Sequence, residues 1–127
     1  MRAFVVLIVF LFSHLPSCAQ EGQRIATPAY WTAVGATALS VYADAYSTAH
    51  YVGHTRRCAV EGWSPWLYGR KPPVARVYGV MTAELVTNSI VTYYLKKRRH
   101  RLWVTPLMAM TGAHGMGAIH NVTDCPD

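Results

Sequence analysis

The feature that most constrains this chain is the separation of its apolar residues from its basic ones. Three long stretches, residues 29–52, 76–95 and 102–122, contain almost no Lys or Arg, and basic residues lie between them. A helix of about 20 residues, rising 1.5 Å per residue, spans the roughly 30 Å of hydrocarbon in a bilayer. The pattern therefore predicts an all-α fold, a three-helix transmembrane bundle.

Composition supports this prediction and argues against one class of partner. Charged residues make up 14% of the 127 residues and apolar residues 52%, whereas charged residues make up about a quarter of an ordinary soluble domain. The net charge of +6 is carried at the borders of the apolar stretches. A nucleic-acid-binding domain would gather such charge on one face over a soluble core. The arrangement instead indicates a lipid bilayer as partner and excludes nucleic acid.

The first 19 residues resemble a secretory leader. Arg2 precedes the apolar run 3–12, which is too short to span a bilayer. Ser17-Cys18-Ala19 matches a small-x-small cleavage site, so we expect residues 1–19 to be a signal peptide and residues 20–127 a single three-span membrane domain. Two alternatives stay open: lipidation of Cys18 within a loose lipobox, and an uncleaved anchor.

The basic residues do not decide how the three spans are oriented. Six flank one side of the membrane and five the other, so the positive-inside rule favours neither orientation. Cys58 and Cys125 fall on the same side in either orientation and could form a disulfide where that side is oxidising. The loop 53–75 combines aromatic and basic residues, a composition that fits contact with anionic lipid headgroups.

Each span carries polar residues that should not face lipid. A carboxylate at the bilayer centre costs about 2.5–3.5 kcal/mol on insertion scales. Spacing of three or four residues places each polar side chain on a face with small neighbours. We therefore predict that the three spans meet along these faces and form a polar intramembrane cluster. Its predicted members are Asp44, Thr48, Glu84, Asn88 and His114.

Two functions are compatible with such a cluster. Its side chains could serve as interhelical hydrogen bonds in a structural or partner-binding membrane module, with another membrane protein as a further partner. Alternatively, the carboxylates and the histidine could hold a cation or relay a proton. The chain contains no G-x-S-x-G, phosphate-loop or H-E-x-x-H motif, which favours a non-enzymatic protein. The sequence indicates no particular metal or cofactor.

Several short motifs resemble a class of small uncharacterised bacterial membrane proteins. Asp44-x3-Thr48 is followed by a loop with Glu61-Gly62-Trp63-Ser64-Pro65 and by Gly-Ala-His-Gly at 112–115. The resemblance covers roughly residues 40–120 and departs at Trp63-Ser64, where the class has asparagine beside proline. It implies a protein of the bacterial inner membrane with no assigned activity. It also marks Asp44, Thr48, Glu61 and Pro65 as positions of interest.

Overall fold

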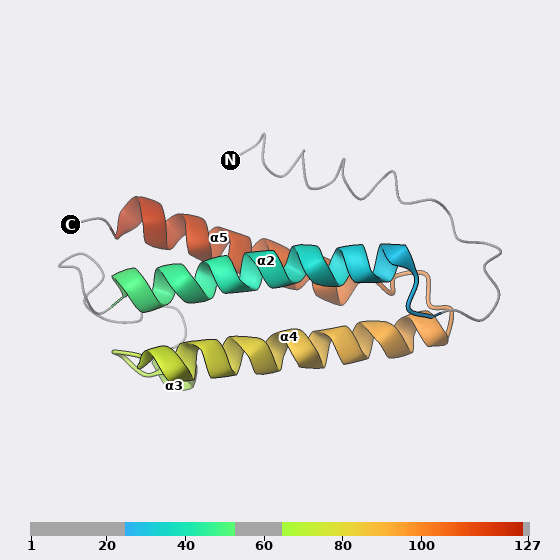
Figure 1. The fold of residues 1–127 in the computed structure, drawn as a ribbon, viewed down its shortest axis with the longest axis horizontal. Helices are drawn as coiled ribbons and strands as arrows, with labels where there is room; N and C mark the ends of the chain where they lie inside the picture. The colour runs from blue at the N-terminus through green and yellow to red at the C-terminus, as the bar shows by residue number, and fades with distance from the viewer. Residues whose placement is uncertain (1–24, 53–64, 126–127) are drawn as a thin grey trace.

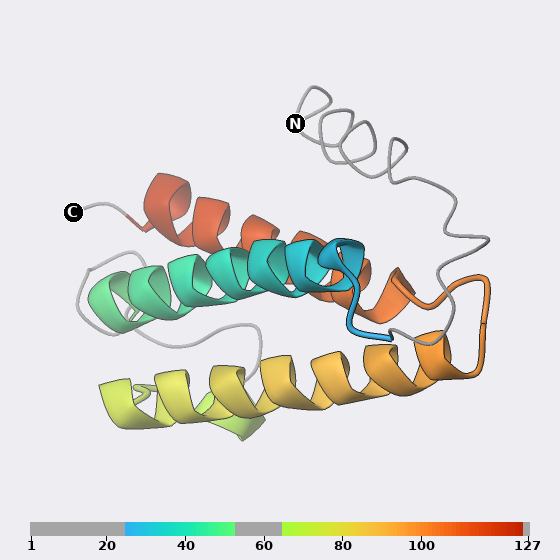
Figure 2. The same ribbon diagram turned by 45° about the vertical axis from the view of Figure 1, so that its right-hand side comes forward.

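The computed structural model describes residues 25–52 and 65–125, and every regular element in these two ranges is a helix. Three long helices, α2 (Pro28–Tyr51), α4 (Val74–Lys97) and α5 (Thr105–Asp124), lie side by side, as Figures 1 and 2 show. The short helix α3 (Pro65–Tyr68) packs against α4. The predicted all-α helical bundle is therefore confirmed.

Local signals explain where these helices begin and end. Thr27 caps α2 by accepting a hydrogen bond from the Tyr30 backbone N–H, and Pro28 occupies the first position, where no donor is needed. The end of α4 is closed by backbone bonds from Arg99 N–H to the Lys96 carbonyl and from His100 N–H to the Leu95 carbonyl. This Schellman pattern places Arg99 in the left-handed region, with φ of 54°.

The closest packing in the bundle is between α2 and α5, while α4 lies mainly against α2. The buried apolar cluster draws on α2, α3, α4 and α5. Its members are Val41, Ala45, Tyr68, Val77, Met81, Leu85 and Met110. Small residues of α5, among them Gly115 and Gly117, allow its close approach to α2.

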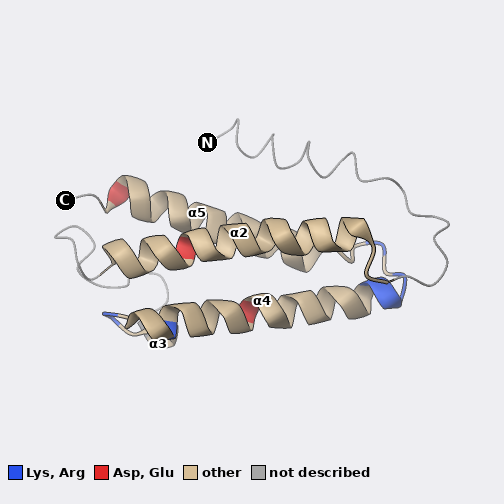
Figure 3. Ribbon diagram, viewed as in Figure 1, with Lys and Arg blue, Asp and Glu red and all other residues tan. Residues whose placement is uncertain are grey.

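Several polar residues lie inside the bundle, beside the buried apolar cluster. Thr37, Asp44, Ser47, Thr48 and Asn121 are all buried between helices. Figure 3 shows the acidic residues of α2 and α4 partway along their helices, whereas Lys and Arg gather at the ends of the bundle. No helix in the described ranges is both long enough and apolar enough to qualify as a membrane span.

Some predicted features fall wholly or partly outside the described residues. The leader, Cys18, Cys58 and Glu61 all lie outside them, and Pro65 is described as the first residue of α3. Cys125, at the end of α5, is buried and disulfide-bonded, with its partner beyond the described ranges. Pairing of Cys125 with Cys58 stays a prediction.

Candidate functional site

The site is built around Asp44, in the second half of α2. Asp44 shares one helix face with Ser40 and Thr48, each four residues away, and this face is turned toward α5. Its side chain is 11% exposed. A carboxylate so deeply buried must be compensated by donors or by positive charge, and neighbouring residues supply both.

His114 of α5 lies between two carboxylates. Its Nδ1 is 2.7 Å from Asp44 Oδ2, and its Nε2 is 3.4 Å from Glu84 Oε2 on α4. The three side chains come from three helices, so the histidine joins the whole bundle at this level. A neutral imidazole carries one N–H and donates to one carboxylate, whereas an imidazolium donates to both.

The other oxygen of Asp44 is held by neutral donors. Asp44 Oδ1 accepts hydrogen bonds of 3.3 Å from the Thr48 hydroxyl and from the Asn121 amide. The same amide nitrogen lies 2.8 Å from Thr48 Oγ1 and 3.1 Å from Ser47 Oγ. Because these groups are buried and bonded to one another, they hold the carboxylate in one orientation toward His114.

Gly117 makes room for the Asp44 carboxylate between α2 and α5. A Cβ atom added at Gly117 would lie 2.8 Å from Asp44 Oδ1 and 3.0 Å from Oδ2, closer than van der Waals contact allows. Gly115 packs similarly against Ser40, with Oγ at 3.3 Å from such an atom. Gly115 and Gly117 therefore allow the close approach of α5 to α2.

The site opens to the surface on one side. A groove between α4 and α5 is lined by Glu84, Asn88, Met110, Ala113 and His114, among others. The Glu84 side chain is 35% exposed, against 13% for His114 and 11% for Asp44. The triad thus runs from a half-exposed carboxylate, through a histidine, to a buried carboxylate.

The structure brings together four of the five residues of the predicted cluster: Asp44, Thr48, Glu84 and His114. Asn88 takes a different role, since its amide donates to the Glu84 backbone carbonyl at 3.0 Å and its side chain lines the groove. The predicted cluster omitted Asn121. Asn121 follows His114 by seven residues on the same helix face, and this spacing could have placed it in the predicted cluster.

A second polar contact lies along the same interface, nearer the start of α2. The Thr37 hydroxyl lies 2.9 Å from that of Thr111, and Ser40 donates to the Thr111 carbonyl at 2.8 Å. These bonds join α2 to α5 away from the charged groups. They serve helix packing, in line with the interhelical hydrogen bonds expected from the small and polar faces.

The described ranges contain no group of three or more His, Cys, Asp or Glu side chains arranged to hold a metal ion. No model of a protein family, no curated protein and no solved structure matches this chain. The resemblance to small bacterial membrane proteins therefore stays a prediction, and any functional argument rests on the geometry of the triad.

Proposed function

We propose that this protein is an integral membrane protein that takes up protons on the Asp44–His114–Glu84 triad and passes them along it. The observation that carries the proposal is the position of His114, with one ring nitrogen at each carboxylate. Chains of Asp, Glu and His inside a bundle are the usual components of intramembrane proton relays. By the resemblance described above, the membrane is the bacterial inner membrane.

The distribution of side chains supports a lipid environment. Several polar residues that lower the hydropathy of α2 and α5, such as Thr37, Asp44 and Asn121, are buried against neighbouring helices. Large apolar residues such as Leu39, Ile90, Met116 and Ile119 face outward. Polar groups bonded between helices, together with large apolar side chains on the outside, suit lipid better than water. At 1.5 Å per residue, the 24-residue helices α2 and α4 are about 36 Å long, enough for the hydrocarbon layer.

Charge counting supports proton uptake. With both carboxylates ionised and His114 protonated, the triad carries one net negative charge. One further proton makes the triad neutral, and loss of a proton from His114 leaves two negative charges. Because net charge is unfavourable in a low-dielectric interior, the triad has a physical reason to accept a proton from the groove. Glu84, the most exposed member, is placed to receive it first.

Proton flux through reconstituted protein tests the proposal. The full chain is placed in liposomes that contain a pH-sensitive dye, and a pH gradient is applied with valinomycin and potassium to balance charge. We expect flux above that of empty liposomes, and at least a tenfold loss of this excess in His114→Gln and Asp44→Asn. His120→Gln is the matched control, because His120 lies on the same helix and pairs with Asp124 on the surface.

Two results would overturn the proposal. One is wild-type flux equal to that of protein-free liposomes. The other is a His114→Gln variant that is folded, as judged by circular dichroism, and conducts protons as fast as the His120→Gln control. The ¹⁵N chemical shifts of the His114 ring provide a direct second readout, since the proposal expects both nitrogens to be protonated while the carboxylates are ionised.

A second candidate function is a structural or partner-binding membrane module. It is favoured by the Thr37–Thr111 and Ser40–Thr111 contacts, which hold α2 against α5 and contain no titratable group. In such a module the triad would only fix which helix faces meet. His114→Gln would then lower the stability of the protein, and the wild type would conduct no protons.

A further inference from the structure

A second surface, on the opposite side of α4 from the triad groove, has the properties of a ligand site. It is a groove between α2 and α4, lined by Tyr30, Trp31 and Val34 of α2 and by α4 residues that include Val86, Ile90 and Tyr94. Trp31 is 59% exposed and Tyr94 55%. Contiguous exposed apolar surface of this kind commonly marks a binding groove.

The floor of this groove is held in place by specific contacts. The Tyr30 hydroxyl donates to the Ser89 carbonyl at 3.0 Å and joins α2 to α4. The Tyr30 ring also makes edge-to-face contacts with Trp31 and Tyr93, at centroid distances of 5.2 and 6.1 Å. Because the protein's own side chains make these contacts, the groove is preformed, and an occupant would not have to order it.

A row of residues on α4 leads from the groove to a positive charge. Val86, Ile90 and Tyr93 follow one another at spacings of four and three residues, and Lys97 comes four residues later on the same helix face. Lys97 is exposed, and no carboxylate of the described residues forms an ion pair with it. The next residues, Arg98 and Arg99, are also exposed and strengthen the positive field at this end.

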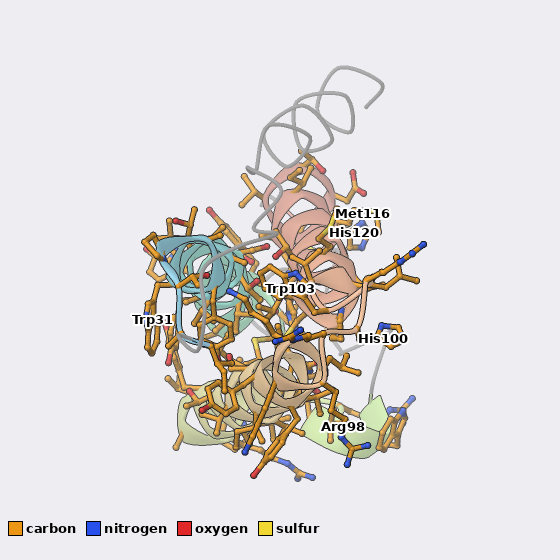
Figure 4. The ribbon with its side chains drawn as sticks, turned by 90° about the vertical axis from the view of Figure 1, so that its right-hand side faces the viewer. Trp31, Arg98, His100, Trp103, Met116 and His120 are labelled. Atoms are coloured by element: carbon orange, nitrogen blue, oxygen red, sulfur yellow. The ribbon has the colours of Figure 1, made fainter. Side chains whose placement is uncertain are left out.

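The side chain of Lys96 points in a different direction from that of Lys97. Its amine bonds the Thr27 hydroxyl and lies 4.6 Å from the centre of the Trp103 ring, so it faces the interior of the bundle end. Figure 4 views this end and shows Trp31 at the outer side of α2, with Trp103 near the middle. Lys97 is therefore the cation at the end of the groove-facing row.

An apolar groove parallel to the helices with cations at its end fits an amphiphile with a long apolar tail and an anionic head. We propose that this groove binds one anionic phospholipid, with an acyl chain between α2 and α4 and the phosphate at Lys97. The inference rests on the membrane location in the proposed function and does not depend on the proton triad.

Charge complementarity favours this occupant over a second copy of the chain. A second copy packed in parallel would bring its own Lys97 and arginines against this cationic end. The exposed carboxylate Asp124 is the last residue of α5 and already pairs with His120. The C-terminal end of α5 lies at the opposite end of the bundle from the C-terminal end of α4 (Figure 3). The described surface therefore lacks an acidic patch to meet the cations, whereas a phospholipid headgroup supplies the needed charge.

Native mass spectrometry of the full chain in detergent tests the proposal. The protein is titrated with phosphatidylglycerol and, separately, with phosphatidylcholine of the same acyl chains. We expect one phosphatidylglycerol to bind at least tenfold more tightly than phosphatidylcholine. Lys97→Gln should weaken phosphatidylglycerol binding about tenfold. Lys71→Gln is the matched control and should leave binding unchanged. Lys71 is an exposed lysine just before α4 begins, at the opposite end of that helix from Lys97.

A change in the groove tests the acyl-chain part of the proposal. Ile90→Gln places a polar group at a half-exposed position, so the fold should be retained while lipid binding weakens several-fold. Equal affinity for the two lipids, or equal loss in Lys97→Gln and Lys71→Gln, would overturn the proposal. Competition by glycerol phosphate as strong as that by whole lipid would also overturn it, since the headgroup alone would then suffice.

The outcomes separate this proposal from the proton function. Protein that conducts protons but does not prefer phosphatidylglycerol contradicts the lipid site alone. Protein that selects phosphatidylglycerol but conducts no protons contradicts the proton relay alone.

Discussion

Replacing Gly117 by alanine should displace the Asp44 carboxylate from its position beside His114. The new Cβ would lie 2.8 Å from Asp44 Oδ1 and 3.1 Å from its Cγ, so the carboxylate or the helix must move. The carboxylate has little freedom to move, because it is bonded to His114 at 2.7 Å and to the Thr48 and Asn121 side chains. The substitution therefore tests the central contact of the site without touching a polar residue.

The expected change in the free energy of unfolding follows from two opposing effects. Overpacking a closely packed interior costs about 1–3 kcal/mol. Alanine in place of glycine within a helix contributes about 1 kcal/mol in the other direction. The net change in the free energy of unfolding should thus be a loss of about 0–2 kcal/mol. Gly112→Ala is the matched control on the same helix, since nothing lies within 4 Å of its added Cβ and only the gain of about 1 kcal/mol applies.

The assay is thermal or denaturant unfolding of both variants in the same detergent, followed by circular dichroism. The two free energies of unfolding should differ by about 1–3 kcal/mol, which for a domain near this size is a separation of at least about 4 °C in melting temperature. The ¹⁵N shifts of the His114 ring should change in Gly117→Ala alone. Equal stabilisation by both alanines, with unchanged His114 shifts, would refute the close approach of Gly117 to Asp44.

Three further predictions concern other parts of the structure, and each is tested by the free energy of unfolding in detergent. Thr37→Val removes a buried hydroxyl that bonds α5 and should cost about 1 kcal/mol. Thr92→Val should be neutral or stabilising, because the Thr92 hydroxyl is the buried side-chain oxygen in the described ranges that has no hydrogen-bond partner. Equal losses of stability in the two variants would contradict this contrast. Asn121→Ala should cost about 1–3 kcal/mol by removing a donor from Asp44, and a change within experimental error would show that this amide does not hold the carboxylate. Arg99→Gly should raise stability by up to about 1 kcal/mol, since glycine adopts φ of 54° without steric penalty, and a loss would argue against the left-handed cap.

The candidate site was only partly predictable, for reasons visible in particular residues. Asp44 and Thr48 share a face because they are four residues apart, and helical periodicity is a local property that the chain itself specifies. Asn88 satisfies the same spacing relative to Glu84, yet its amide bonds a backbone carbonyl of its own helix. Spacing placed Asn88 near the carboxylate without determining what its side chain would bond.

The contribution of Gly117 depended entirely on the fold. Among the glycines of α5, Gly112 faces open space and Gly117 faces Asp44, although both stand in the same helix and in similar sequence surroundings. The difference arises from the rotation of α5 about its axis relative to α2. That rotation is set by the combined packing of many side chains, and no single motif in the sequence encodes it.

The sequence by itself determined that the chain forms helices, where they begin and end to within a few residues, and which polar side chains share a face. These properties depend on contacts within three or four residues, on capping by Thr27 and on the breaks between apolar stretches. Only the tertiary structure decided that the imidazole of His114 lies between Asp44 and Glu84, since these residues stand on three helices whose relative rotation and offset are fixed by packing. A shift of one residue, about 1.5 Å along a helix and 100° around it, would separate them.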